Sequence, residues 1–170
     1  MKKIQIESRM MGEIALGSII PAALKYQSAL VENVNGLKEI ATAEATSLKG
    51  EIKSKKAVLA GGDEFMAESQ QLPSGRGLSN GGFASLAGSQ IETIREISEH
   101  VSAIQKNVYK MIEARKKANN LEDAQDKAIA YCEHVKPYLD EIRYHADKLE
   151  FVVDDELWVL PKYREMLFTR

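Results

Sequence analysis

Apolar side chains recur at steps of three and four along most of this chain, which is the spacing of one face of an α-helix. The clearest stripe runs through Ala124, Ala128, Tyr131, Val135, Tyr138, Ile142, His145, Leu149 and Val152. It predicts a helix over 120–153, with Asn120 as its N-cap and carboxylates in its first turn. Pro137 lies inside the stripe, so we expect a kink near that residue.

Two further stripes predict two further helices. One helix, over 89–118, carries Ile94, Ile97, Val101, Ile104, Val108 and Met111 at helical spacing. Ser89 and Glu92 have the spacing of a capping box, and a short connection to the next helix predicts an antiparallel hairpin. The other helix, over 3–39, is interrupted by Pro21. Ile4 enters its pattern with no capping residue ahead, so we expect the chain to begin partway through a helix, as a fragment would.

The middle of the chain has a different composition. A weak pattern predicts a short helix over 44–60, and seven of the eleven glycines then lie within 61–88, which predicts a flexible Gly/Ser-rich linker. Alternation with period two is absent, so no strand is expected. The fold class is therefore all-α: one domain over 1–170, built as a bundle of about three long, kinked helices.

The C-terminal stretch LWVLPKYREMLFTR is the most apolar part of the tail, 154–170. Pro161 is suited to the first turn of a short helix, in which aromatic and aliphatic side chains share a face. Ordering such a tail costs conformational entropy, so docking requires a groove that already exists. Candidate docking residues are Leu157, Trp158, Leu160, Tyr163, Met166, Leu167 and Phe168.

Charge and composition exclude several classes of partner. The net charge is −2 with 28% charged residues, which provides no basic field for nucleic acid or a membrane surface. No apolar run approaches the ~18 residues of a spanning helix. The N-terminus is interrupted by charges where a signal peptide needs apolar residues, and the single cysteine cannot form an internal disulfide. These features predict a cytoplasmic, reducing environment.

Candidate chemistry is sparse. The stretch PSGRGLSNGGF lacks the Lys and Ser or Thr that a phosphate loop needs after its second glycine. We expect His145 to pack in the core, His100 and His134 to face solvent, and Cys132 to be a buried or half-buried thiol without a base beside it. The residues thus predict no catalytic, cofactor-binding or metal site.

Three separated stretches resemble one family. They are IQIESRMMGEIALGSIIPAALKYQSALVENVNGLKEI at 4–40, RKKANN at 115–120 and DKLEFVVDDELWVLPKYREMLFTR at 147–170. In this order they resemble the carboxy-terminal region of type III glutamine synthetases. The resemblance covers 3–40 and 89–170, and nothing between Ala41 and Gly88 contributes to it.

The resemblance implies a parent enzyme that joins ammonia to glutamate with ATP and a divalent metal, Mg or Mn. Such an enzyme is cytoplasmic and assembles as stacked hexameric rings, so the implied partners are its catalytic domain and neighbouring subunits. Its catalytic motifs lie upstream and are absent here, so the segment is expected to be inactive alone. Two alternatives stay open: a free-standing helical adaptor that binds a protein partner, and a regulatory site for a small ligand between the helices.

Overall fold

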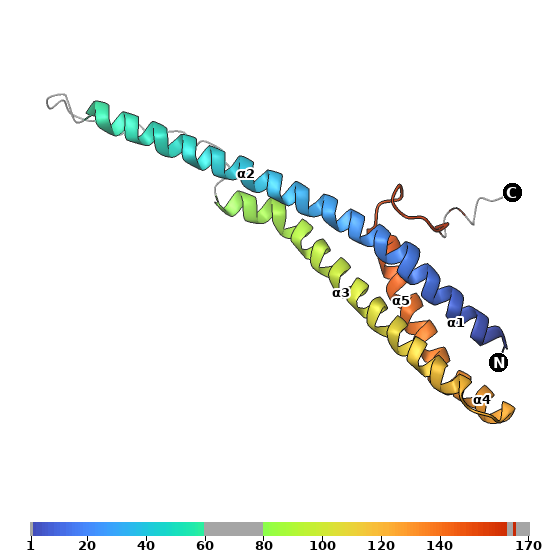
Figure 1. Ribbon diagram of the computed structural model, residues 1–170. Helices are drawn as coiled ribbons and strands as arrows, with labels where there is room; N and C mark the ends of the chain where they lie inside the picture. The colour runs from blue at the N-terminus through green and yellow to red at the C-terminus, as the bar shows by residue number, and fades with distance from the viewer. Residues whose placement is uncertain (1, 60–79, 163–164, 166–170) are drawn as a thin grey trace. The chain divides into compact units, whose positions relative to one another are not determined.

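The computed structural model describes residues 2–59, 80–162 and 165, and every regular element in this part of the chain is a helix (Figure 1). The first helical rod consists of α1 (Lys2–Ile14), the π-helical turn η1 (Ala15–Ile19) and α2 (Ile20–Leu59). The second is α3 (Asn80–Asn119). The third consists of α4 (Ala124–Ala130), the π-helical turn η2 (Tyr131–Val135) and α5 (Lys136–Val152). The prediction of an all-α fold with three long helices is confirmed.

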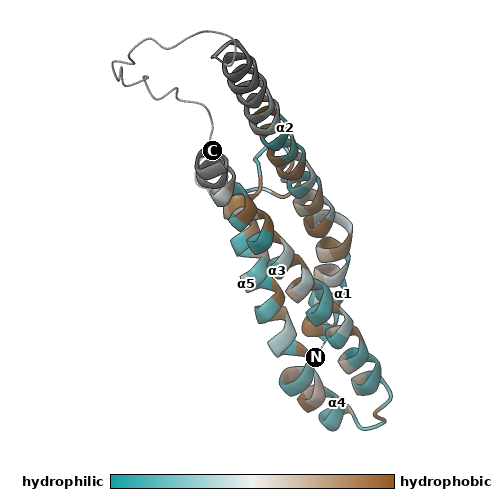
Figure 2. Cartoon of the chain, turned by 90° about the vertical axis from the view of Figure 1, so that its left-hand side faces the viewer, coloured by the Kyte–Doolittle hydropathy of each residue, from teal (hydrophilic) through white to brown (hydrophobic). Residues whose placement is uncertain are grey.

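The chain divides into two compact units, and the larger one contains Met1–Leu30 and Thr93–Arg170. Within it, α3 runs antiparallel to both α1 and α5 (Figure 1). Each of these three helices carries both apolar and polar residues (Figure 2). The apolar residues of each helix form one stripe, and the three stripes meet in a shared core. Its buried members are Ala15, Ile19, Ala23, Ile97, Val101, Ile104, Val108, Met111, Ala118, Tyr131, Val135, Ile142, Leu149, Val153 and Trp158.

Small residues let α1 approach α3 closely. Gly12 is buried on α1. A Cβ placed there would lie 3.7 Å from Met111 Cε and 3.8 Å from Val108 Cγ1 on α3. Ala15 and Ile19 continue the same buried face one and two turns further along. The long side chains of α3 therefore pack directly over the backbone of the first rod.

The prolines distort two rods at the predicted places, but they neither end nor split the helices. η1 ends at Ile19 and η2 at Val135, each two residues before a proline. The N–H of Ile20 bonds to Ala15 O, and the N–H of Lys136 bonds to Tyr131 O. A proline ring clashes with the carbonyl four residues earlier. A turn widened to five residues moves that carbonyl away from the ring, so the helix continues beyond it.

Several predicted boundaries are wrong. No separate helix covers 44–60, because α2 continues to Leu59, and α3 already begins at Asn80. Residues 80–88 of the predicted linker are therefore helical, and Ser89 is an interior residue, not a cap. Glycine lowers helix propensity by only about 1 kcal/mol each, which packing can offset, and Ala87 is buried in this turn. The remainder of the predicted linker, 60–79, lies outside the described residues.

The N-cap of the third rod is Asp123, not Asn120. Its Oδ2 accepts hydrogen bonds from Gln125 N at 2.8 Å and Asp126 N at 3.0 Å. These backbone donors hold the pKa of the Asp123 carboxyl below its usual value. Asn120 still belongs to the end of α3, since its N–H bonds to Lys116 O and Lys117 O at 3.3 and 3.2 Å. Both residues are good caps, so sequence alone did not decide between them.

One helical stretch corrects the expectation about apolar runs. Among the described residues, Lys2–Ala43 contains a window long and apolar enough to cross a membrane, with 28% of that window buried. From Ile14 to Val31 the only charged residue is Lys25. The same helix supplies Ala15, Ile19 and Ala23 to the core. A core helix passes the same test of length and composition, so this finding is weak evidence for a span.

The smaller unit, Val31–Glu92, contains the later part of α2 and the first turns of α3. Along α2 the hydroxyls of Thr42 and Thr46 donate to carbonyls of the preceding turn, at Glu39 O and Thr42 O, both 2.8 Å. Ile40 and Ile91 are exposed apolar residues in this unit.

Candidate functional site

The candidate docking segment folds back immediately after α5. Val153 N bonds to Leu149 O at 2.8 Å, and Asp154 O then accepts from Leu157 N at 3.1 Å and Trp158 N at 3.0 Å. Lys162 closes the segment, because its Nζ donates to Val153 O at 3.2 Å and pairs with the Asp155 carboxylate. We name residues 153–162 the tail turn.

Trp158 anchors the tail turn in the bundle. Its side chain is 8% exposed and belongs to the buried cluster, while Leu157 and Leu160 are half-buried against that cluster. Val159 points the other way and is 73% exposed. The remaining candidate docking residues, Tyr163, Met166, Leu167 and Phe168, lie outside the described residues.

The indole of Trp158 carries an unusual polar atom. Its Nε1 is buried and has no hydrogen-bond partner among the described residues. An unpaired buried N–H costs about 1–3 kcal/mol relative to a paired one. Trp158 therefore stabilises the bundle through its ring area, against an opposing cost at this nitrogen.

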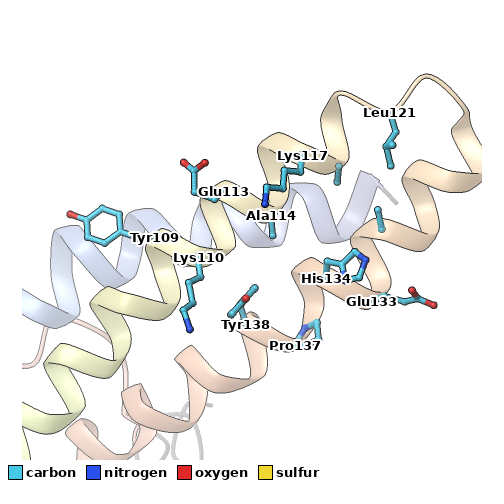
Figure 3. A pocket seen from close by; sticks show the side chains of 12 residues that line it. Tyr109, Lys110, Glu113, Ala114, Lys117, Leu121, Glu133, His134, Pro137 and Tyr138 are labelled. Carbon is cyan, nitrogen blue, oxygen red and sulfur yellow. The ribbon is translucent and has the colours of Figure 1, made fainter.

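A groove of about 990 Å³ lies between the C-terminal half of α3 and the third rod. Three small residues, Ala114, Ala118 and Ala130, line this groove together with Tyr109, Lys110, Glu113, Lys117, Leu121, Glu133, His134, Pro137 and Tyr138. Figure 3 shows Glu113 and Glu133 pointing away from the groove, with the His134 ring lying between α3 and η2. A bond to Lys116 at 2.7 Å lowers the pKa of Glu113, so this rim carboxylate is already paired.

Sequence reasoning missed this groove, because it depends on two helices that meet across the connection at 120–123. The available signal was alanine repeated at a step of four, at Ala114 and Ala118, which leaves room beside a helix. The groove is open and largely apolar, and such surfaces accept an apolar body or a helix.

Two histidines that the sequence separated are brought together. His100 Nδ1 and His145 Nδ1 lie 2.9 Å apart, joining α3 to α5. The expectation that His100 faces solvent is wrong, since its side chain is only 17% exposed. His145 is half-buried at the edge of the core, and His134 is exposed, as predicted.

Cys132 and its neighbour Tyr131 differ in burial, and the burial of Cys132 also differs from the prediction. The expectation of a buried or half-buried thiol is wrong, because Cys132 is exposed. Its neighbour Tyr131 fills the core instead, and its hydroxyl donates to Asn119 Oδ1 at 2.7 Å. Burial raises the pKa of Tyr131. This bond joins the end of α3 to the start of η2, which fixes the hairpin.

Potential metal ligands do not gather in the described part of the chain. Within it, no three side chains among His, Cys, Asp and Glu come together as a ligand group. Near the His100 and His145 pair, Glu96 Oε1 lies 3.8 Å from His100 Nε2, on the side away from His145, and the charge of Glu141 acts on His145.

Comparison with known proteins relates this bundle to one family. Residues 1–38, which form α1, η1 and the beginning of α2, match the glutamine synthetase C-terminal domain. Over 168 residues, 99% of this chain, the sequence is 40% identical to a glutamine synthetase of Bacteroides fragilis (strain YCH46). The chain is therefore similar to glutamine synthetases over nearly its whole length, and its first rod is similar to their C-terminal domain. It is also 22% identical over 169 residues to the type-3 glutamine synthetase of Dictyostelium discoideum.

The glutamine synthetase relatives are much longer than this chain, which spans 18% of the length of each. Both alignments cover 99% of the chain, so they include the middle stretch as well as the two bundle segments. The family match at 1–38 falls on the rod whose Gly12, Ala15 and Ile19 pack beneath α3.

Proposed function

We propose that this chain is the non-catalytic C-terminal helical domain of a type III glutamine synthetase, with a role in packing and assembly of that enzyme. The observation that carries the proposal is the alignment of 99% of the chain with a glutamine synthetase at 40% identity and with a type-3 glutamine synthetase at 22%. The anchored tail turn supports a packing role, because Trp158 makes it part of the folded bundle.

The proposed parent enzyme ligates ammonia to glutamate in the cytoplasm, at the expense of ATP and with Mg or Mn. Its partners for this domain are the catalytic domain and neighbouring subunits of a homo-oligomer of hexameric rings. The described residues here do not fit a divalent metal site, since no group of three metal-ligating side chains forms among them. In this proposal, ATP and metal are bound by the part of the enzyme outside this chain.

The non-catalytic part of the proposal is tested on the chain itself. Purified residues 1–170, supplied with glutamate, ammonia, ATP and Mg²⁺, should form no glutamine in a coupled assay for ADP release and glutamine. Formation of glutamine above a no-protein control would contradict the proposal.

The assembly role is tested on a longer synthetase that contains this chain. Removal of these residues should lower the number of subunits per particle measured by mass photometry, that is, lower the particle mass by more than the 18.9 kDa that each truncated subunit loses, because subunit contacts are lost. Cys132→Ser is a matched control, since it changes one exposed atom and should leave the particle intact. An unchanged particle after removal would show that the domain does not serve assembly.

The groove of about 990 Å³ favours a second function, that of a free-standing helical adaptor which binds a partner helix. The two functions differ in their genetic context. The synthetase proposal requires a reading frame that continues upstream of Met1 into synthetase sequence, whereas the adaptor requires a translation start at that codon.

A further inference from the structure

The histidine pair holds one shared proton between two helices. The two Nδ1 atoms are 2.9 Å apart, and the ring centroids are 5.1 Å apart with a tilt of 50°. At this distance one nitrogen must donate and the other accept, so one of the two Nδ1 atoms carries a hydrogen. The neutral pair therefore links α3 to α5 with a single hydrogen bond.

The charged groups and rings recorded around the pair come from α3 and α5. On α3, Glu96 Oε1 lies 3.8 Å from His100 Nε2. On α5, the charge of Glu141 acts on His145, and the Tyr144 ring meets His145 edge-on at 5.2 Å, with Lys148 Nζ 5.6 Å from the Tyr144 centroid. Earlier on α3, the uncharged Gln27 of α2 donates hydrogen bonds to Ser98 Oγ at 2.6 Å and to Ile94 O at 3.2 Å.

Full protonation is incompatible with this geometry. If both rings carry two protons, each Nδ1 is a donor, so the shared hydrogen bond is lost and two cations face each other. Burial lowers the pKa of His145, the charge of His100 lowers it further, and Glu141 opposes them. A carboxylate stands on each helix, so the first added proton is tolerated better than the second.

His145 lies on α5 about two turns before the helix ends, and the tail turn follows the end of this helix. His145 and Leu149 are four residues apart and therefore share one face of α5, and Val153 is the residue that caps the end of this helix. Leu149 and Val153 are buried with Trp158, and Val153 begins the tail turn. Separation of α5 from α3 at His145 would loosen the end of α5, where Leu149 and Val153 are buried in the same cluster as Trp158.

We propose that His100 and His145 form a proton-operated clasp, which holds α5 and the tail turn in place when neutral and releases Trp158 from its seat when both rings are protonated. The clasp makes the docked state of the C-terminal segment sensitive to mild acid. This inference does not depend on the activity of a parent enzyme.

Trp158 is the single tryptophan of the chain, so its fluorescence reports the tail turn alone. The emission maximum of the chain should move to longer wavelength as the pH falls from 8 to 5, with a midpoint below about 6.5, the ordinary pKa of histidine. Far-UV circular dichroism at each pH should show that the helices persist through this change.

Three variants locate the transition. His145→Gln and His100→Gln each leave one ring that can take up a proton without a cationic neighbour, so both should remove the shift. His134→Gln is the matched control, because His134 is exposed and lies in the groove at η2. It should reproduce the wild-type curve.

The clasp is refuted by an emission maximum that stays constant in the wild type between pH 8 and 5. It is equally refuted if His145→Gln and His100→Gln both retain the wild-type transition, or if His134→Gln alone removes it. Should one of the two pair variants lose its helical signal at pH 8, the other decides the outcome.

Discussion

Gly12 offers a sharp test of the α1–α3 contact, because a buried glycine ordinarily signals that no side chain fits. Here an added Cβ would lie 3.7 Å from Met111 Cε and 3.8 Å from Val108 Cγ1, which are ordinary van der Waals separations. Gly12→Ala should therefore fill space without displacing α3. We expect this substitution to stabilise the bundle.

The magnitude has two parts. Glycine is less favourable than alanine inside a helix by about 0.8–1.0 kcal/mol. A buried methyl group adds about 0.8 kcal/mol when its neighbours already surround it. The free energy of unfolding should rise by about 1.5–2 kcal/mol. Gly17→Ala is the matched control on the same rod, because no atom lies within 4 Å of its added Cβ, so only the first part applies.

Urea denaturation followed by far-UV circular dichroism measures both changes. The difference between the two variants, about 0.8 kcal/mol, isolates the contact with Met111 and Val108. A Gly12→Ala protein that is less stable than the wild type, or that gains no more than Gly17→Ala, would show that α1 and α3 do not pack as described.

Four further substitutions or conditions test other contacts. Trp158→Ala should lower the unfolding free energy, measured by calorimetry, by about 3–5 kcal/mol, reduced by the cost of the unpaired Nε1 that the substitution removes. Trp158→Phe should lower it far less, because this substitution removes the nitrogen and keeps an aromatic ring. Equal losses of stability in the two variants would contradict this. Tyr131→Phe should cost about 1 kcal/mol in urea unfolding through the lost bond to Asn119, and Asn119→Ala should not add to it. Asp123→Ala should reduce helical signal at neutral pH, and because the folded pKa of Asp123 is lowered, its contribution should be present above pH 3.8 and fade below it. The lowered pKa of His145 has the same sign, so its contribution to thermal stability should be complete above pH 6.5 and lost as the pH falls through the folded pKa; a melting temperature that rises toward pH 5 would contradict this.

The spacing of residues in the sequence predicted which positions of each helix are buried. It did not predict features that depend on how two helices pack together. Ile97, Val101, Ile104, Val108 and Met111 are all buried, as their spacing on one helical face requires. Helix ends were less predictable, because glycine near Asn80 only weakens a helix and several good capping residues stand in a row before Ala124. Packing chose between those alternatives.

The candidate sites show the same division. An apolar C-terminal segment was visible in the sequence, and the ring of Trp158 within it is buried among residues of all three rods, which are distant in the sequence. The pairing of His100 with His145 depends on the rotation of α5 against α3, and periodicity fixes neither rotation nor height along a partner helix. Single-helix patterns therefore could not reveal the histidine pair or the groove near Pro137.

The wide turns before Pro21 and Pro137 have a consequence for changes in chain length. Each of these turns contains one residue more than an α-helical turn. If that extra residue were removed, the helical segments before and after it would form one regular α-helix with the same faces toward the core. Deleting one residue from Tyr131–Val135 together with Pro137→Ala should leave Ile142 and Leu149 facing the core. In related chains, single-residue insertions and deletions should accumulate beside these two prolines. A change of one residue there alters the width of the turn and does not rotate the buried face of the following helix toward solvent.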